Sequence, residues 1–175
     1  MTGATFEVPP LSRRDIRGKA AIFRRDLDLK RAYLDVLRLI EVPLADLITL
    51  EGCDHQEMGA CHGLSYPDAR RILIREDVYQ GARNGLGRDR FTVAHELGHL
   101  VLHHNLGLAR AMPSANQIQP FRSSEWQANC FAGELLVSHL HLKGCETPRD
   151  LEERFGVSGE AADLQFRKFK EEKLI

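Results

Sequence analysis

The chain has 175 residues, 28% of them charged and 43% apolar, and its 24 basic side chains nearly balance 25 acidic ones. These values are typical of a globular protein, and they argue against a generic nucleic-acid binder, which would carry excess positive charge. Because the chain has no run of about 18 apolar residues and its first residues lack an apolar leader core, we expect a cytoplasmic protein with no membrane partner.

Two helices are predicted first, at residues 11–26 and 29–40, with Pro43 ending the second. Basic residues gather in the first of these helices, but three aspartates interrupt them. We therefore interpret this surface as a solvent-exposed helix face rather than a phosphate-binding one.

Three short strands are predicted in the Gly-rich stretch that follows, at residues 48–51, about 58–64 and 70–75. They imply a small sheet, whose edge could hold an extended peptide by strand addition. The same stretch contains four soft metal ligands, whose spacing matches no common zinc module. A second metal site there is an alternative that the sequence leaves open; its ligands would be Cys53, His55, Cys61 and His62.

Residues 89–104, DRFTVAHELGHLVLHH, form the most informative predicted element, a helix with an apolar stripe. His95 and His99 are four residues apart, so both lie on one helix face, where they can bind one zinc ion at about 2.0–2.1 Å. Glu96 lies at the edge of that face, where its carboxylate can accept a proton from water activated by the metal. Gly98 lowers helix propensity by about 1 kcal/mol relative to Ala, which predicts a close packing partner.

Two further features of this helix follow from its pattern. Asp89 is the expected N-cap. His103 is eight residues from His95, about 12 Å along the helix axis, so it cannot complete the same tetrahedral site. We interpret His103 as a histidine that interacts with the helix dipole or supports a ligand indirectly. The following residues, 105–122, are predicted to form a loop, either a lid that contacts substrate or a passive connection.

The third metal ligand is expected in a helix that starts near Ser124, with the sequence SEWQANCFAGELLV. Ser124 and Gln127 form a capping-box pattern. Glu125 in the first turn could complete a His-His-Glu site, and the Asn129 amide one turn later could orient a ligand. The alternative for Glu125 is an exposed acid favoured by the helix dipole, and spacing alone does not decide between the two.

Small residues in the same helix predict a close helix pair. Ala128, Ala132 and Gly133 would allow this helix to lie directly against the helix that carries Gly98. Such an approach is what a shared metal site between the two helices requires.

The last predicted elements form a helix-turn-helix-like unit. Pro148 suits the first position of one helix, Gly156 to Ser158 make the turn, and a second helix extends to about Lys173. In DNA readers of this kind the start of the second helix meets the base edges. Here that start carries Glu160 and Asp163, which phosphates would repel, so we favour a docking or substrate-positioning role and do not expect direct DNA binding.

Two segments together resemble a known family. RFTVAHELGHLVLH followed by EWQANCFAGELLV is similar to the paired signature of the ImmA/IrrE family of metallo-endopeptidases, and weaker similarity covers most of residues 15–170. By this resemblance, His95, His99 and Glu125 correspond to the metal ligands and Glu96 corresponds to the catalytic acid/base. The proline that often follows the second helix in the family is absent after Val137.

The resemblance implies a fold class and a cofactor. We expect an α+β, zincin-like metallopeptidase, with a small antiparallel or mixed sheet flanking the helix that bears the two histidines. Residues 1–145 would form the zinc metallopeptidase domain, and residues 146–175 the helix-turn-helix-like appendage. One zinc ion per chain is expected, in a gluzincin-like His-His-Glu site.

The resemblance also implies a function. Typical targets in the family are helix-turn-helix repressors of stress responses or mobile elements, so we expect a zinc endopeptidase that cleaves such a transcriptional regulator. The alternative is a non-proteolytic, antitoxin-like regulatory module that keeps the metal for stability. The intact Glu96 argues against this alternative, because a structural zinc site needs no base. The sequence leaves a second oxyanion donor open among Tyr66, Tyr79, His104, His139 and His141.

Overall fold

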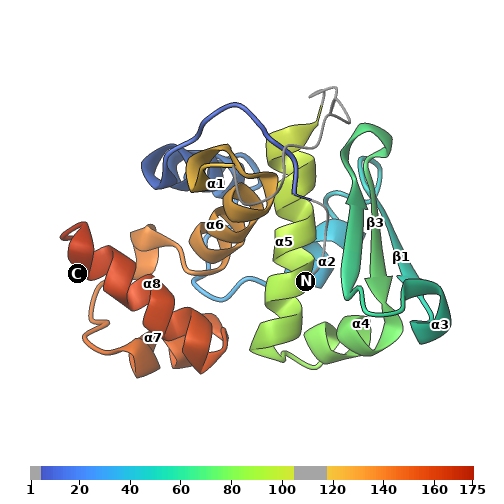
Figure 1. The fold of residues 1–175 in the computed structure, drawn as a ribbon. Helices are drawn as coiled ribbons and strands as arrows, with labels where there is room; N and C mark the ends of the chain where they lie inside the picture. The colour runs from blue at the N-terminus through green and yellow to red at the C-terminus, as the bar shows by residue number, and fades with distance from the viewer. Residues whose placement is uncertain (1–4, 105–117) are drawn as a thin grey trace.

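The computed structural model describes residues 5–104 and 118–175, and its fold is α+β, as predicted (Figure 1). Helix α5 stands between a small sheet on one side and helices α1, α6 and α8 on the other. The helices are α1 (Arg13–Asp26), α2 (Val36–Glu41), α3 (His55–Met58), α4 (Glu76–Arg83), α5 (Gly87–His103), α6 (Ser124–Leu136), α7 (Pro148–Phe155) and α8 (Gly159–Glu171). The strands are β1 (Thr49–Cys53), β2 (Gly63–Tyr66) and β3 (Arg71–Arg75). Within these residues no helix is long and apolar enough to cross a membrane.

The sheet is mixed and has the strand order β1-β3-β2. Strand β1 pairs parallel with the central β3, and β2 pairs antiparallel with the other edge of β3. The predicted strand at about 58–64 is wrong before Gly63, where β2 begins. Met58 instead ends α3 (His55–Met58), which is capped by the Asp54 side chain. The chain then turns at Gly59, whose φ of +56° favours glycine, before β2 begins.

The second predicted helix is also shorter than expected. Helix α2 begins only at Val36, where the Asp35 carboxylate accepts a hydrogen bond from the backbone N–H of Arg38. Upstream of this cap, backbone carbonyls bind arginine side chains: Arg24 donates to the carbonyl of Arg31, and Arg90 donates to that of Leu34. These contacts satisfy the backbone without a helix, which explains why residues 29–35 differ from the prediction.

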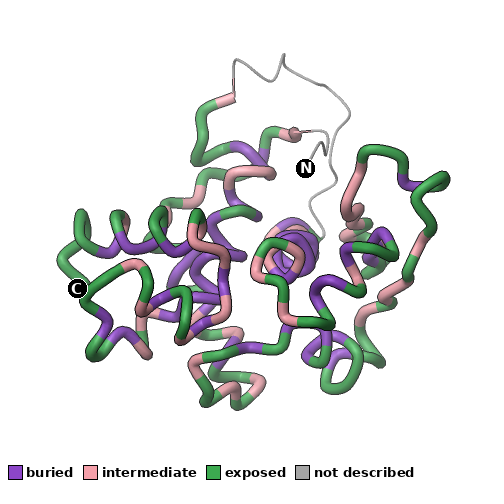
Figure 2. The backbone as a smooth tube through the Cα atoms, turned by 90° about the horizontal axis from the view of Figure 1, so that it is seen from below, coloured by how far each residue is buried: buried purple, intermediate pink, exposed green. Residues whose placement is uncertain are grey.

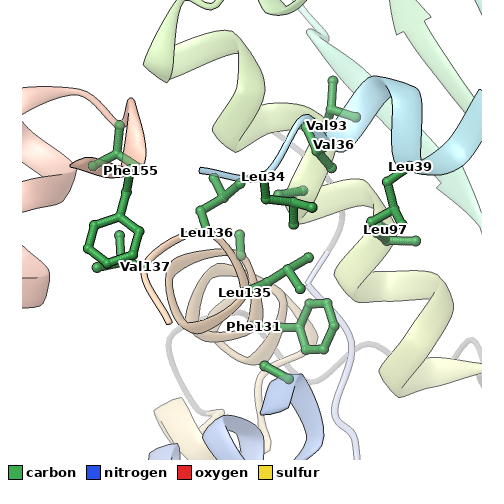
Figure 3. Close-up of a cluster of buried hydrophobic side chains, with 14 of the residues drawn as sticks. Leu34, Val36, Leu39, Val93, Leu97, Phe131, Leu135, Leu136, Val137 and Phe155 are labelled. Carbon is green, nitrogen blue, oxygen red and sulfur yellow. The ribbon is translucent and has the colours of Figure 1, made fainter. Parts of the chain in front are cut away.

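The hydrophobic core surrounds α5, whose turns are mostly buried (Figure 2). Val93 and Leu97 of α5 meet Phe131, Leu135 and Leu136 of α6 in a hydrophobic cluster (Figure 3). The same cluster includes Leu34, Val36, Leu39 and, from α7, Phe155. Burial of aliphatic and aromatic side chains of this size contributes about 1.5–3 kcal/mol each. The core thus fixes α5 against α6, the two helices that carry the predicted metal ligands.

Close backbone approach between α5 and α6 depends on Gly98. A Cβ atom at this position would lie 3.2 Å from the carbonyl oxygen of Ala128 and 3.2 Å from Cδ1 of Phe131. The predicted contact of Gly98 with Ala128 is therefore confirmed. Gly133 serves another contact, because a Cβ there would meet the Gln165 side chain of α8 at 3.0 Å.

Arg90 ties the start of α5 to two distant segments. Its buried guanidinium donates to the carbonyl oxygens of Leu34, Phe155 and Gly156, and it stacks 4.1 Å from the ring centroid of Tyr33. Gly156 has a φ of +62°, and a side chain there would meet Arg90 and Tyr33 at 2.7 Å. Since a buried guanidinium needs hydrogen-bond acceptors, these carbonyls hold the end of α7 against α5.

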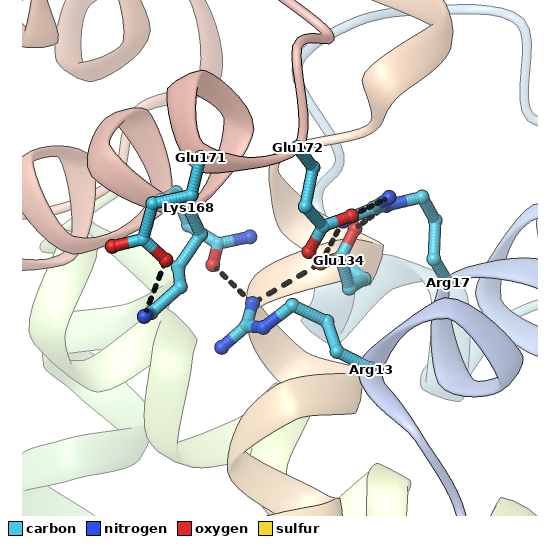
Figure 4. Close-up of polar contacts among 7 residues, drawn as sticks. Arg13, Arg17, Glu134, Lys168, Glu171 and Glu172 are labelled. Atoms are coloured by element: carbon cyan, nitrogen blue, oxygen red, sulfur yellow. Dashed lines mark hydrogen bonds and ion pairs between the residues drawn. The ribbon is translucent and has the colours of Figure 1, made fainter.

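The C-terminal helices form as predicted. Thr147 caps α7 in a capping box with Asp150, and Ser158 caps α8. Helix α8 packs on α1 and α6 through an ion-pair network around the fully buried Glu134 carboxylate (Figure 4). Arg17 contacts Glu134 at 2.8 Å and also reaches Glu172, at the end of α8. The core includes residues on both sides of position 145, while the domain boundary placed there stays a prediction.

The N-terminal segment lies along the start of α6. Glu7 forms an isolated antiparallel bridge with Ser123, and the backbone N–H of Phe6 donates to the Ser124 hydroxyl at 3.0 Å. The N–H of Val8 donates to the carbonyl of Arg122 at 2.8 Å. Most of the loop predicted at 105–122 lies outside the described residues, and its end forms a short 3-10 helix, Pro120–Arg122.

Candidate metal centre

Both ligand-bearing helices begin at residues other than the predicted caps. Helix α5 starts at Gly87, so Asp89 lies in its first turn and packs against Gly81 instead of capping the helix. In α6 the cap is Ser123, whose hydroxyl accepts from the N–H of Trp126. The neighbouring Ser124 hydroxyl binds the N-terminal segment instead. The predicted capping roles of Asp89 and Ser124 are therefore wrong.

Three side chains from these helices converge in what we call the His-His-Glu cluster: His95, His99 and Glu125. The Nε2 atoms of the two histidines are 3.1 Å apart. Glu125 places Oε2 3.3 Å from Nε2 of His95 and Oε1 3.2 Å from Nε2 of His99. The structure thus brings together all three residues that the sequence named as ligands, one from α6 and two from adjacent turns of α5.

The donor set and its spacing fit a zinc ion. Ligands about 2.0–2.1 Å from a tetrahedral zinc are about 3.3 Å apart, close to the separations found here. The Nδ1–H of His95 donates to the Asn129 amide oxygen at 3.0 Å, so the lone pair of Nε2 points into the cluster. Imidazole lone pairs and carboxylate oxygens this close repel one another unless a cation or a proton lies among them.

The negative charge of Glu125 also favours a bound cation in the cluster. Burial of Glu125 disfavours a charged carboxylate unless a cation lies next to it. Within the described residues, the ion pairs of Glu125 involve only these two histidines, with no lysine or arginine. The carboxylate charge is therefore left for an exogenous cation to balance.

Glu96 lies beside the cluster and against the sheet. Its side chain is buried, and burial, outweighing the opposing effect of the two histidines, raises its pKa above the ordinary value. A Cβ atom on Gly63 would lie 2.8 Å from Cγ of Glu96, so the backbone of the edge strand β2 passes directly over this carboxylate. Glu96 therefore lies between helix α5 and β2, a strand at the edge of the sheet.

His103 supports the cluster indirectly. Its Nδ1 lies 3.1 Å from Nδ1 of His99, and its Nε2 lies 3.3 Å from the amide oxygen of Gln127. Burial lowers the pKa of His103 to about 4, so it is not a cation that interacts with the helix dipole. Of the two interpretations offered for His103, the structure favours support of a ligand. Sequence reasoning treated Gln127 only as a capping residue and missed its contact with His103.

A cavity of about 540 Å³ lies between α5, α6 and α8. The three cluster residues do not line it, but Asn129, the partner of His95, forms part of its wall. Other wall residues are Arg88, Phe91, Thr92, Trp126 and Leu164. Its mixed apolar and basic lining suits a side chain of a bound peptide.

Two of the residues that the sequence left open as oxyanion donors have other partners. The Tyr79 hydroxyl contacts Glu41, and His141 contacts the carbonyl of Lys30. The four ligands considered for a second metal do not form a compact group: among residues 5–104 and 118–175, three or more such ligands come together only in the His-His-Glu cluster.

Comparisons with known proteins bear on this geometry. The family model described as the IrrE N-terminal-like domain (Peptidase_M78) matches residues 55–167, which is more than half of the chain. The matched region includes the sheet edge, α5, α6 and all three residues of the cluster. A search of curated proteins finds no match.

Proposed function

Because the chain belongs to the IrrE N-terminal-like (Peptidase_M78) family of metallopeptidases, we propose that it is a zinc-dependent endopeptidase acting on a protein substrate. The observation that carries this proposal is the His-His-Glu cluster with a buried carboxylate, Glu96, beside it. Three protein ligands leave a fourth position open in a tetrahedral site, as catalytic zinc sites require.

His95, His99 and Glu125 would hold one zinc ion per chain. When bound, zinc supplies a Lewis acid that lowers the pKa of water and polarises the carbonyl of the bond to be cleaved. Asn129 keeps His95 in the tautomer whose Nε2 lone pair faces the cluster.

Glu96 is the proposed general base and acid. Its carboxylate accepts a proton from the attacking water and then transfers that proton to the leaving amine, so the carboxylate is regenerated in each cycle. The side chain is only 5% exposed, which limits exchange of this proton with bulk water. Packing of Gly63 against Glu96 fixes the carboxylate next to the path of a substrate bound on β2.

Strand β2 provides the proposed binding edge for the substrate. It pairs with β3 on one side, and its other edge borders α5 near Glu96. An extended peptide could add to this edge through backbone hydrogen bonds, while the adjoining cavity accepts one of its side chains. This arrangement supports cleavage within an extended segment of a protein.

The proposed substrate is a helix-turn-helix repressor, which would place the enzyme in transcription regulation and stress response. The support for this class is the similarity of both active-site helices to the ImmA/IrrE family. Direct DNA binding is not part of the proposal, since Glu160 and Asp163 at the start of α8 would repel phosphates. Arg13 and Arg17 are likewise occupied by Glu134.

Metal content is the first test. Elemental mass spectrometry of the purified protein should give one zinc per chain, and Glu125→Ala should weaken or abolish this binding. Zinc retained unchanged by Glu125→Ala would show that another residue is the third ligand. Absence of metal from wild type, even after zinc is supplied, would contradict the proposed function.

Cleavage is the second test. Incubated with a panel of purified helix-turn-helix repressors, the zinc-loaded wild type should cut a member of the panel at one site. Glu96→Gln should retain zinc but cut about 10²–10⁴-fold more slowly. Glu153→Gln, an exposed control on α7, should behave as wild type. If wild type binds a repressor without cutting it, the non-proteolytic module is the better description.

A further inference from the structure

A chain of hydrogen bonds leads from His99 to the protein backbone. Nδ1 of His99 contacts Nδ1 of His103 at 3.1 Å, and Nε2 of His103 contacts the Gln127 amide oxygen at 3.3 Å. The amide nitrogen of Gln127 donates to the carbonyl oxygens of Pro9 and Phe121, each at 2.8 Å. His103 and Gln127 are each about 1% exposed, so water cannot readily replace these partners.

The donor and the acceptor of each hydrogen bond in this chain can be assigned by starting from Gln127. The carbonyls of Pro9 and Phe121 can only accept, so the amide nitrogen of Gln127 must face them and its oxygen must face His103. Nε2 of His103 therefore carries a proton. Among residues 5–104 and 118–175, the hydrogen-bond partners of His103 include no acid, and a buried imidazolium without one is costly, so its Nδ1 is left as an acceptor. Nδ1 of His99 must then be the donor.

We propose that His103 and Gln127 are positioning residues that fix the tautomer of His99. With its proton on Nδ1, His99 directs the Nε2 lone pair toward His95 and Glu125, as a metal ligand requires. One of the two carbonyls that hold the Gln127 amide belongs to Pro9, which lies outside the region matched by the family model. The N-terminal segment thus contributes to the metal centre without touching it.

The two histidines of the cluster are therefore oriented in different ways. His95 binds an amide oxygen of α6 directly, whereas His99 depends on two intermediate side chains. Loss of such an indirect partner typically weakens metal binding by about 10–100-fold. This inference rests on the proposed metal site, but its test can fail separately.

The first experiment uses the wild-type protein, freed of metal and labelled with ¹⁵N. Long-range NMR correlations of the imidazole rings should show His99 protonated on Nδ1 and His103 protonated on Nε2. The opposite tautomer at either residue would overturn the proposal. The tautomers are measured in metal-free protein, so this result does not depend on zinc binding. A wild type that binds no zinc would refute the proposed function, while the NMR spectra would still decide the tautomer of His99.

The second experiment measures zinc affinity by competition with a chelator. Gln127→Leu removes the acceptor for His103. We therefore expect a zinc dissociation constant that is about 10–100-fold larger than that of wild type, and a mixture of His99 tautomers in NMR spectra. Gln165→Leu is the matched control, because Gln165 is an equally buried glutamine whose oxygen contacts Arg13 on the other face of α6. Its zinc affinity should stay within about twofold of wild type.

A folded Gln127→Leu protein with wild-type zinc affinity and an unchanged His99 tautomer would overturn the proposal. If Gln127→Leu does not fold, His103→Leu tests the same chain and should give the same loss of affinity. Wild-type affinity in the folded His103→Leu protein would be equally decisive against the proposal.

Discussion

Helix α6 carries two carboxylates that the fold treats differently. Glu125 and Glu134 are nine residues apart, or about two and a half turns, so they lie on opposite faces of the helix. Glu134 faces α1 and α8, is fully buried, and is bound by the guanidinium groups of Arg13 and Arg17 (Figure 4). Glu125 faces α5, is 20% exposed, and contacts two imidazoles instead.

The two glutamates differ in where the positive charge that balances each carboxylate comes from, and this difference distinguishes a packing role from a metal-binding one. A buried carboxylate needs a partner of opposite charge. At Glu134 the chain itself provides two permanent cations, which close that face of α6. At Glu125 the described residues provide nitrogen ligands, and in the proposed zinc site the balancing cation comes from solution. One helix thus uses a glutamate for packing at one end and, in that proposal, for metal binding at the other.

The largest expected effect follows from removing the charge at Glu125. Glu125→Gln should weaken zinc binding about a thousandfold, or about 4 kcal/mol, since zinc sites with four ligands bind with about 10–16 kcal/mol in total. Without metal, this variant should be as stable as wild type or more stable, because repulsion within the cluster is relieved. Chelator competition and urea unfolding would measure the two effects. Marked destabilisation of the metal-free variant would contradict the comparison.

Removing the other carboxylate should have the converse result. Glu134→Gln leaves Arg17 with Glu172 and Arg13 with Gln165, so we expect a loss of unfolding free energy of about 3 kcal/mol, at the low end for a broken buried pair. Zinc affinity should change by less than about threefold, because the two faces of α6 are separate. Urea denaturation together with chelator competition tests both statements. A large drop in zinc affinity would show that the faces are coupled.

Zinc itself should stabilise the wild type only through the Glu125 face. Free zinc at 100 times its dissociation constant should raise the unfolding free energy by about 2.7 kcal/mol. Thermal melts of wild type and Glu134→Gln should both shift upward with zinc, whereas the Glu125→Gln melt should move little. An equal shift in all three proteins would place the bound zinc elsewhere.

A smaller effect is expected from changing the contact that brings the two helices together. Gly98→Ala would raise helix propensity by about 1 kcal/mol, but its methyl group would press on the Ala128 backbone and Phe131 at 3.2 Å. We expect a net destabilisation of about 1 kcal/mol and a zinc affinity several times weaker, because Glu125 moves away from α5. A melt and a zinc titration would detect both, and stabilisation without a change in affinity would show that the contact can relax.

The smallest effect should come from Arg13. Its side chain is 17% exposed, and Arg17 remains to neutralise Glu134 when Arg13 is removed. Arg13→Ala should therefore reduce stability by less than about 1 kcal/mol, a value typical of a partly exposed ion pair. Urea denaturation of Arg13→Ala beside Arg17→Ala would rank the two, with the larger loss for Arg17. Equal losses would mean that both guanidinium groups are indispensable to Glu134.

The parts of the site that depend on local periodicity could be predicted from the sequence. The i, i+4 spacing places His95 and His99 on one face, and the cost of a helical glycine predicts the close contact at Gly98. Glu125 could not be derived in this way, because an acid in a first helical turn is ordinary, and only the resemblance singled it out. Gln127 was missed for a similar reason: its partners Pro9 and Phe121 come from other segments.

The errors in the fold have the same cause. Residues 29–35 have a helical pattern, but their backbone carbonyls bind Arg24 and Arg90, which lie outside the segment. Met58 ends a helix instead of starting a strand because Asp54 caps residues 55–58 locally, a signal that competes with the apolar pattern after Met58. Long-range side-chain contacts decided the first case, and competing local signals decided the second.

The pairing of the N-terminal segment with the start of α6 also sets an order of events in folding. Phe6 and Ser124 are 118 positions apart, and closing a chain segment of that length carries an entropic cost of about 4 kcal/mol. Contacts of such long range generally form late. The N-terminal segment can pair with the start of α6 only once residues up to Ser124 have been synthesised. The Pro9 carbonyl that accepts from Gln127 is therefore added to the site late, whereas the Ser123 cap of the turn that carries Glu125 is local.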